Sequence, residues 1–184
     1  VNTLDTAASV QEVVDSYNHI LDLRDTGTGI TLDAADFTDL GVTLKAAGTE
    51  QDQQVSYLQE IVADNLGSGV ITTVAGLQAL ADATSDLIDL IQGTSPDSDG
   101  AEGLTVGQWD LLGVTAVDDE EAAMLSARLA LTDLSDVTNL ATDLDSLVEE
   151  SRDALNVITR YANEDGIDPN GDTGNSNLEF VVVD

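Results

Sequence analysis

Five oxygen-bearing side chains near the end of the chain follow the spacing of an EF-hand-like calcium loop. Asp168, Asn170, Asp172, Ser176 and Glu179 stand at positions 1, 3, 5, 9 and 12 of such a loop. Carboxylate, amide and hydroxyl oxygens are the ligands that calcium takes in proteins. The spacing therefore predicts a calcium site at these five residues, with calcium as the one candidate cofactor.

Two features of the same segment favour a different interpretation. Thr173 stands at the position where the sharp turn of a calcium loop favours glycine. Residues 180–183 are rich in valine, which is typical of a strand rather than of the helix that leaves an EF-hand. A plain Asp/Asn/Gly linker is the alternative to a calcium loop.

No pattern in the chain is typical of an enzyme. His19 is the single histidine, and it stands on a helical stretch beside Ile20, where we expect it to face solvent. Neighbouring carboxylates such as Asp118 and Asp119 are common, but general acid–base catalysis needs a cleft for which a thin helical bundle has little room. We expect no catalytic residue and no enzymatic activity.

Phe37 and Trp109 are aromatic residues that recur in one shared context. Each is followed, after two residues, by the sequence Leu-Gly-Val, at 40–42 and at 112–114. Exposed rings would suit stacking on a glycan, whereas rings beside leucines at helical spacing are more often core residues. We expect both rings to be buried, and a buried Trp109 predicts blue-shifted fluorescence.

The charge of the chain excludes two classes of partner. Its 184 residues include 36 Asp and Glu but only 5 Lys and Arg, for a formal net charge of -31, and the basic residues are scattered. Such a field repels nucleic-acid phosphates and anionic lipid headgroups. No apolar run approaches the roughly 18 residues of a membrane span. We therefore expect neither nucleic-acid binding nor membrane insertion.

The composition also indicates a helical protein in a salty or calcium-rich exterior. Hydrophobic residues make up 42% of the chain and aromatic residues only 3%, which suits thin helical bundles. Self-repulsion at this charge requires screening salt or bound cations. The lack of cysteine excludes disulfides and thiolate chemistry. We expect an extracellular location, and an acidic halophilic cytosolic protein is the alternative.

Three stretches share one amphipathic pattern and follow one another at a constant displacement, the one that leads from Val10 to Leu77 and on to Leu144. The spacing i, i+3, i+4, i+7, i+10, i+11 is that of one face of an α-helix. The stretches are Val10, Val13, Val14, Tyr17, Ile20 and Leu21; Leu77, Leu80, Ala81, Thr84, Leu87 and Ile88; and Leu144, Leu147, Val148, Ser151, Ala154 and Leu155. The residues expected to cap them are Thr6, Thr73 and Thr138.

Shorter elements lie between these long helices. Residues 31–42 and 104–114 resemble each other around Leu-Gly-Val, at the slightly larger displacement that separates Gly41 from Gly113. Each predicts a short helix that is opened by Thr31 or Thr105 and closed by its glycine in the left-handed conformation. A middle helix follows in each copy, around residues 55–64 and 120–131. Loops absorb the difference between the two displacements.

These elements predict an all-α chain of tandem three-helix bundle modules with a period of about 67 residues. Residues 1–27 are expected to be the last helix of a preceding repeat. This helix should dock on the first module, because its apolar face would otherwise be exposed. Residues 28–98 and 99–163 are the two predicted modules, and residues 164–184 an acidic linker that includes the strand-like segment.

The order of aromatic residue, Leu-Gly-Val and Thr-capped long helix resembles the repeated helical modules of large bacterial surface adhesins of the type I-secreted, RTX-like class. It is also similar to albumin-binding-type three-helix modules of Gram-positive surface proteins. The resemblance covers about residues 3–163. It implies a monomeric structural spacer that extends an adhesin from the cell surface for attachment or biofilm formation, with neighbouring repeats of the same chain as partners. The alternative is a three-helix module that binds a host or matrix protein through a helix face.

Overall fold

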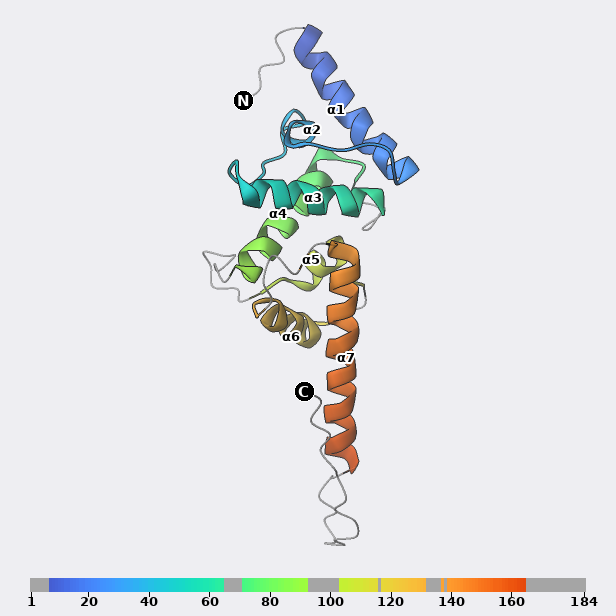
Figure 1. Cartoon of the computed structure of the whole chain (residues 1–184), viewed down its shortest axis with the longest axis vertical. Helices are drawn as coiled ribbons and strands as arrows, with labels where there is room; N and C mark the ends of the chain where they lie inside the picture. Colours follow the sequence, from blue (N-terminus) through green and yellow to red (C-terminus); the bar gives the residue numbers. More distant parts are fainter. Residues whose placement is uncertain are drawn as a thin grey trace, which may run out of the picture. The chain divides into compact units, whose positions relative to one another are not determined.

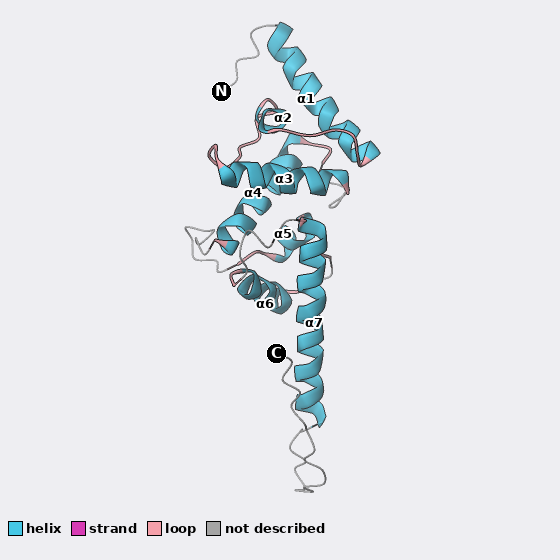
Figure 2. Ribbon diagram, viewed as in Figure 1, coloured by secondary structure: helices cyan, strands magenta, loops and turns pink. Residues whose placement is uncertain are grey.

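The computed structural model describes residues 7–64, 71–92, 103–115, 117–131, 137 and 139–164. In these ranges the backbone forms seven α-helices and no strand (Figures 1 and 2). The helices are α1 (Ala7–Thr26), α2 (Ala34–Thr38), α3 (Thr49–Ala63), α4 (Val74–Ile91), α5 (Val106–Leu111), α6 (Asp119–Leu129) and α7 (Leu140–Glu164). The all-α class predicted from the sequence is confirmed.

Backbone contacts divide the chain into two compact units, Val1–Glu149 and Glu150–Asp184. The first unit holds α1 to α6 and the first residues of α7. The second holds the rest of α7. The module boundaries predicted after residues 27 and 98 stay predictions.

The long helices α1, α4 and α7 cover the three stretches that repeat in the sequence. The side chain of Thr73 accepts a hydrogen bond from the backbone N–H of Gly76 at 3.0 Å, so the predicted N-cap of α4 is confirmed. At the start of α7 the cap is Asn139, whose side chain accepts from Thr142 N at 3.0 Å. Thr6 and Thr138 lie outside the described residues.

The short helices α2 and α5 end in the same C-terminal motif. Val42 N donates to Phe37 O at 3.1 Å, and Val114 N donates to Trp109 O at 2.9 Å. Gly41 has a φ of 85° and its counterpart 92°, in the left-handed region that glycine adopts without strain. These bonds define a Schellman motif, in which the residue after the glycine packs on the residue five positions earlier. The motif explains why an aromatic residue and Leu-Gly-Val recur at one fixed spacing.

The predicted start of α2 is wrong. Asp33 and not Thr31 is the N-cap, because its carboxylate accepts from the N–H groups of Ala35 at 2.8 Å and Asp36 at 3.3 Å. The Asp36 carboxylate in turn accepts from the N–H of Asp33 at 2.9 Å, which completes a capping box. In α5, Thr105 caps as predicted.

The middle helices α3 and α6 lie where the sequence indicates, although α3 begins at Thr49 rather than near Val55. Helix α1 packs on α2 and α3, and α4 packs on α3, α5 and α6 (Figure 1). The buried side chains form one core that includes Phe37, Trp109 and the inner residues of α4. Both rings are fully buried, which confirms that they are core residues.

The expected docking of the first helix is confirmed for its C-terminal half only. Ile20 is fully buried and Leu23 is 2% exposed, whereas Val10 and Val14 are 48% and 45% exposed. The apolar face of α1 is therefore covered at one end and open at the other.

Candidate functional site

The predicted calcium ligands Asp168, Asn170, Asp172, Ser176 and Glu179 lie outside the described residues. Within the described part of the chain, no group of three or more His, Asp or Glu side chains is arranged to hold a metal ion. Calcium binding at residues 168–179 therefore stays a prediction. The candidate site that the structure does show is a set of polar contacts between the long and short helices.

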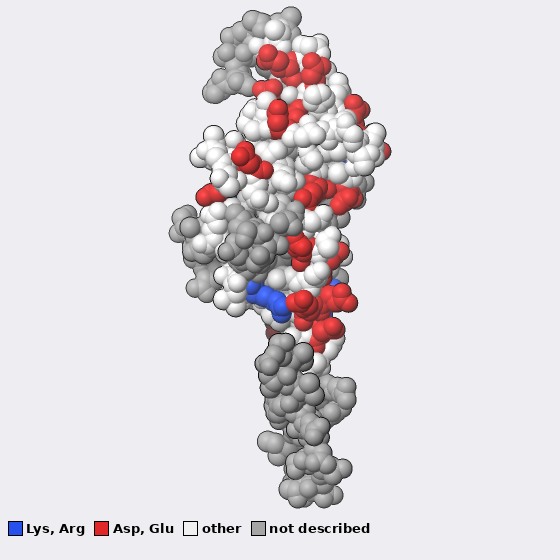
Figure 3. Space-filling view, viewed as in Figure 1, with Lys and Arg blue, Asp and Glu red and all other residues white. Residues whose placement is uncertain are grey.

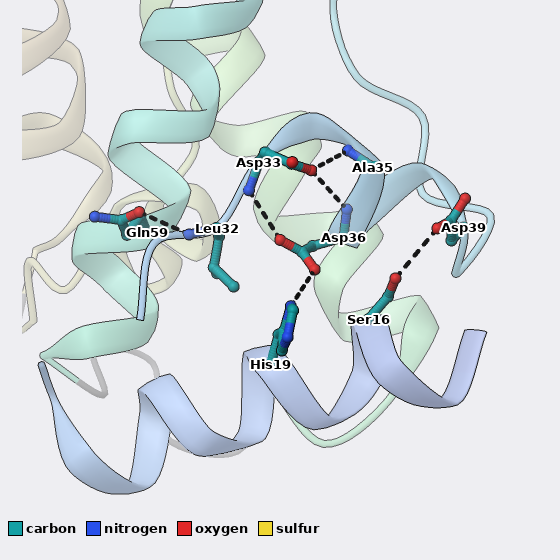
Figure 4. Close-up of polar contacts among 8 residues, drawn as sticks. All are labelled: Ser16, His19, Leu32, Asp33, Ala35, Asp36, Asp39 and Gln59. Carbon is teal, nitrogen blue, oxygen red and sulfur yellow. Dashed lines mark hydrogen bonds and ion pairs between the residues drawn. The ribbon is translucent and has the colours of Figure 1, made fainter. Parts of the chain in front are cut away.

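The first set of contacts joins α1 to α2 (Figure 4). His19 Nδ1 lies 2.9 Å from Asp36 Oδ1, and the Ser16 hydroxyl donates to Asp39 Oδ2 at 3.2 Å. Ser16 and His19 lie one helical turn apart on α1, so both reach the short helix from the same face. The His19 side chain is 56% exposed, in agreement with its expected position toward solvent.

This group of residues has the composition of a Ser-His-Asp triad but not its geometry. In a triad the histidine bonds the nucleophilic hydroxyl with one ring nitrogen and the carboxylate with the other. Here the Ser16 hydroxyl donates to Asp39, and the carboxylate beside His19 belongs to Asp36, which also closes the capping box of α2. These contacts position α2 on α1, and they give no support to nucleophilic catalysis.

The same contact recurs between α4 and α5. The residue at the third position of the short helix is Asp36 in α2 and Gln108 in α5, and each reaches the long helix before it. Gln108 Nε2 donates to Asp86 Oδ2. Asp86 holds in α4 the place that His19 holds in α1, at the displacement that leads from Val10 to Leu77. Different residue types thus make one contact at matched positions.

A second contact also recurs, between the middle helix and the residue before the N-cap of the short helix. Leu32 N donates to Gln59 Oε1 at 2.9 Å, and Leu104 N donates to Ser126 Oγ at 2.9 Å. The displacement along the chain from Gln59 to Ser126 equals the displacement of the long helices. The displacement between the two leucines equals the displacement of the short helices. In this pair of hydrogen bonds the acceptors are therefore separated by the displacement of the long helices, and the donors by the displacement of the short helices.

The Ser126 contact leads to a testable prediction. Because Ser126 is buried, Ser126→Ala leaves the N–H of Leu104 without its acceptor, and we expect a loss of about 1–3 kcal/mol in the free energy of unfolding. Urea unfolding followed by circular dichroism measures this loss. The matched control is Ser56→Ala on the exposed side of α3, expected to stay within about 0.5 kcal/mol of the parent. Equal effects of the two substitutions would contradict the contact.

Gly103, beside this contact, has no room for a side chain. A Cβ atom at this position would lie 2.6 Å from Ser126 Cβ, and its φ of 122° is one that other residues rarely adopt. The loop therefore approaches α6 closely enough for the serine hydroxyl to reach the backbone.

Glutamine side chains of α3 and α4 hold the loops through backbone groups, a role that sequence reasoning missed. Gln54 is buried; its amide donates to Ala81 O at 2.7 Å and accepts from Lys45 N at 2.8 Å. Gln78 accepts from Thr43 N at 2.7 Å. Of the glutamines at the start of α3, Gln54 therefore belongs to the packed interior, whereas Gln51 and Gln53 are half-buried. Hydrophobic periodicity does not indicate a buried glutamine, because its amide counts as polar whether the side chain is buried or exposed.

Lys45, the single lysine, makes the one ion pair between α4 and the loop before α3 that the described residues show. Its Nζ lies 2.7 Å from Asp89 Oδ1 and 3.3 Å from Glu50 Oε2. Burial lowers the pKa of Lys45, but the hydrogen bonds to Asp89 and Glu50 outweigh it, so the pKa is raised above its usual value. The pair stabilises this loop as long as the lysine carries its proton.

The side of α3 that carries Tyr57 contacts the start of α7 within the first unit. The Tyr57 hydroxyl donates to Val137 O at 3.0 Å, and Leu140 N donates to Glu60 Oε2 at 2.6 Å. Tyr57 is fully buried, and burial raises its pKa to about 12. Helix α3 therefore bonds to two long helices, α4 through Gln54 and α7 through Glu60.

These two raised pKa values predict a loss of stability in alkali. In the unfolded chain tyrosine loses its proton near pH ~10, while folded Tyr57 keeps it to about 12, so the free energy of unfolding should fall as pH rises through this window. Lys45 acts in the same direction, because its raised pKa stabilises the fold only below the point where the lysine deprotonates. Urea titrations at a series of pH values test this, with Tyr57→Phe expected to flatten the fall.

The face of the molecule drawn in Figure 3 is acidic. Asp and Glu side chains are spread over it, and the few basic atoms in view lie beside acidic ones. No described helix combines the length and apolar character needed to cross a membrane.

No protein-family model, curated protein or solved structure matches the chain. The resemblance to adhesin modules therefore stays a prediction, and the contacts of the chain itself carry the argument about its function.

Proposed function

We propose that this chain is a structural extender, a tandem array of three-helix repeats that serves as a spacer in a bacterial cell-surface adhesin. In this role each repeat adds length between the cell and an adhesive domain, and no catalytic or ligand-binding residue is needed. The partners are neighbouring repeats of the same chain, and the protein is a monomer outside the cell.

The observation that carries the proposal is the recurrence of one contact set. Three features stand at matched positions in the two copies. Each short helix has a Schellman end, its third residue bonds to a long helix, and the residue before its N-cap bonds to a middle helix. Repeats with shared nearest-neighbour contacts stack into arrays whose stability is a sum over units and interfaces.

The packing of helix α4 favours a continuous array of repeats rather than separate modules joined by flexible linkers. It packs on α3 before it in the chain and on α5 and α6 after it. Because one long helix packs on the helices before it and on the helices after it, the two groups of helices share a continuous core. Such a joint transmits force through packed side chains.

The acidic composition supports the proposed location. A net charge of -31 keeps an array soluble and makes its repeats repel one another unless salt or cations screen them. Calcium, proposed to bind at residues 168–179, would supply such cations outside a cell.

Adding copies tests the extender. A second copy of residues 27–93 inserted directly after residue 93 keeps the register of the long helices and supplies one more α2, α3 and α4. We expect each added copy to raise the helical signal and to increase the radius of gyration by a similar step, whereas a compact globule grows only as about the 0.4 power of its length. A copy with scrambled residue order is the control. An inserted copy that stays unfolded, or steps that shrink as in a globule, would contradict the proposal.

The surface location has a separate test. Antibodies raised against this chain should label intact, unpermeabilised cells that produce it, and brief protease treatment of those cells should remove the label. Labelling that requires permeabilisation would exclude the adhesin role and would favour the halophilic cytosolic alternative.

A further inference from the structure

Half of the apolar face of α1 is open, although the matching face of α4 is fully covered. In α4 the residues Leu77 and Ala81 are fully buried. Their counterparts in the preceding long helix are Val10 and Val14, which are 48% and 45% exposed. The residues between them follow the same rule: Val13 is half-buried, and its counterpart Leu80 is 1% exposed.

Helix α3 is what covers this face in α4. The two helices pack on each other, and Gln54 of α3 donates to Ala81 O at 2.7 Å and to Thr84 Oγ1 at 3.5 Å. Leu58 and Ile61 follow Gln54 at helical spacing on the same face of α3, and both are fully buried.

The rest of α1 has the neighbours that its match to α4 predicts. Helix α1 packs on α2 and α3 as α4 packs on α5 and α6. His19 of α1 contacts Asp36 of α2, and the matching Asp86 of α4 contacts Gln108 of α5. The contacts that α4 makes with α3 and with the loop before α3, through Gln78 and Asp89, are therefore the part of the α4 environment that the described neighbours of α1 do not supply.

We propose that the α1 stripe, formed by Val10, Val13 and Val14, binds a helix of the α3 type supplied by another repeat of the same kind. The occupant is an amphipathic helix with apolar side chains at the positions of Leu58 and Ile61. This inference rests on the proposed repeat array, and it identifies the surface through which one repeat engages the next. Burial of two valines that are now about half exposed supplies the hydrophobic driving force.

The test adds the missing helix in register. Residues 31–67 are joined directly ahead of Val1, so that residue 67 precedes residue 1 as it precedes residue 68 in the chain. The protein has no cysteine, so Val14→Cys places a single thiol on the stripe. Asp15→Cys is the matched control, because Asp82, its counterpart in α4, is exposed. The rate of reaction with a thiol reagent is measured in the original and the extended chains.

We expect the added segment to slow labelling at Val14→Cys by at least about tenfold, as expected for a thiol that reacts only through local opening, and to leave Asp15→Cys unchanged. Leu58→Asp in the added copy alone should restore the fast rate. Unchanged labelling of Val14→Cys in the extended chain would overturn the inference, whether or not the added residues become helical. Concentration-dependent protection in the original chain would overturn it in another way, since the occupant would then be a second copy. The inserted-copy and surface-labelling experiments have different readouts, so their failure is distinguishable from failure here.

Discussion

Replacing Trp109 by alanine should lower the free energy of unfolding by about 3–5 kcal/mol, among the largest effects of any single substitution in this chain. The ring is fully buried in the core and is the residue on which Val114 closes the Schellman motif of α5. Its removal opens a cavity and weakens the motif that ends the helix. Since small domains are stable by only about 5–15 kcal/mol, this loss is a large part of the total. Urea unfolding followed by circular dichroism measures it.

Two reciprocal substitutions serve as controls. The indole Nε1 of Trp109 is buried and has no hydrogen-bond partner among the residues that the structure describes, a state that costs about 1–3 kcal/mol. Phe37 fills the matching place in α2 without such a group, so Trp109→Phe should cost much less than Trp109→Ala, about 1 kcal/mol or less. Phe37→Trp should destabilise by about 1–3 kcal/mol, because it adds both bulk and an unpaired N–H. A Trp109→Phe variant as unstable as Trp109→Ala would refute this account.

The helices and their buried faces could be predicted from the sequence, because they depend on patterns that the chain states locally. The helical period of about 3.6 residues located α1, α4 and α7, and the recurrence of Leu-Gly-Val located the ends of α2 and α5. In a Schellman motif the residue after the glycine often makes a hydrophobic contact with the residue five positions earlier, which here is the aromatic residue. The burial of Phe37 and Trp109 follows from that geometry.

The polar contacts could not be predicted, because they depend on which backbone groups tertiary packing leaves without a partner. Thr31 and Asp33 are both good N-caps, and only the fold decides for Asp33. The displacement that separates Gly41 from Gly113 also separates Asp33 from Thr105, a signal that a search for threonine alone overlooks. The contacts from α3 and α6 to the residue before the N-cap of each short helix are made at matched positions by different residue types, Gln59 and Ser126, so sequence similarity does not show them.

The exposure of one end of α1 shows that matched positions in a sequence repeat need not be equally buried. Val10 and Leu77 hold the same place in the repeat and differ in exposure from 48% to none. Helical periodicity identifies the face that is able to pack, whereas the neighbouring helix decides whether it does. The sequence therefore indicates the apolar face, and the structure shows that one end of this face is exposed.

Because helix α4 is shared, we expect a destabilising substitution in α1 to lower the unfolding midpoint that Trp109 reports. Ile20 is fully buried on α1, a helix that packs on α2 and α3, whereas Trp109 belongs to α5, which packs on α4 and α6. Ile20→Ala should cost about 2–5 kcal/mol, and at about 2–4 °C per kcal/mol for a chain of this size the midpoint should fall by roughly 4–20 °C. Because α3 packs on both α1 and α4, we expect the thermal transition reported by Trp109 fluorescence to fall by the same amount as the helical signal of the whole chain.

Val14→Ala on the same helix is the control, since this residue is 45% exposed and its truncation should change stability by no more than about 0.5 kcal/mol. If Ile20→Ala lowers an early helical transition but leaves the Trp109 midpoint in place, the two groups of helices unfold independently. The chain would then be a row of separate modules, and force along it would unfold one group without the other. Coincident transitions would instead make α4 the element that couples them, as an extender built on a continuous core requires.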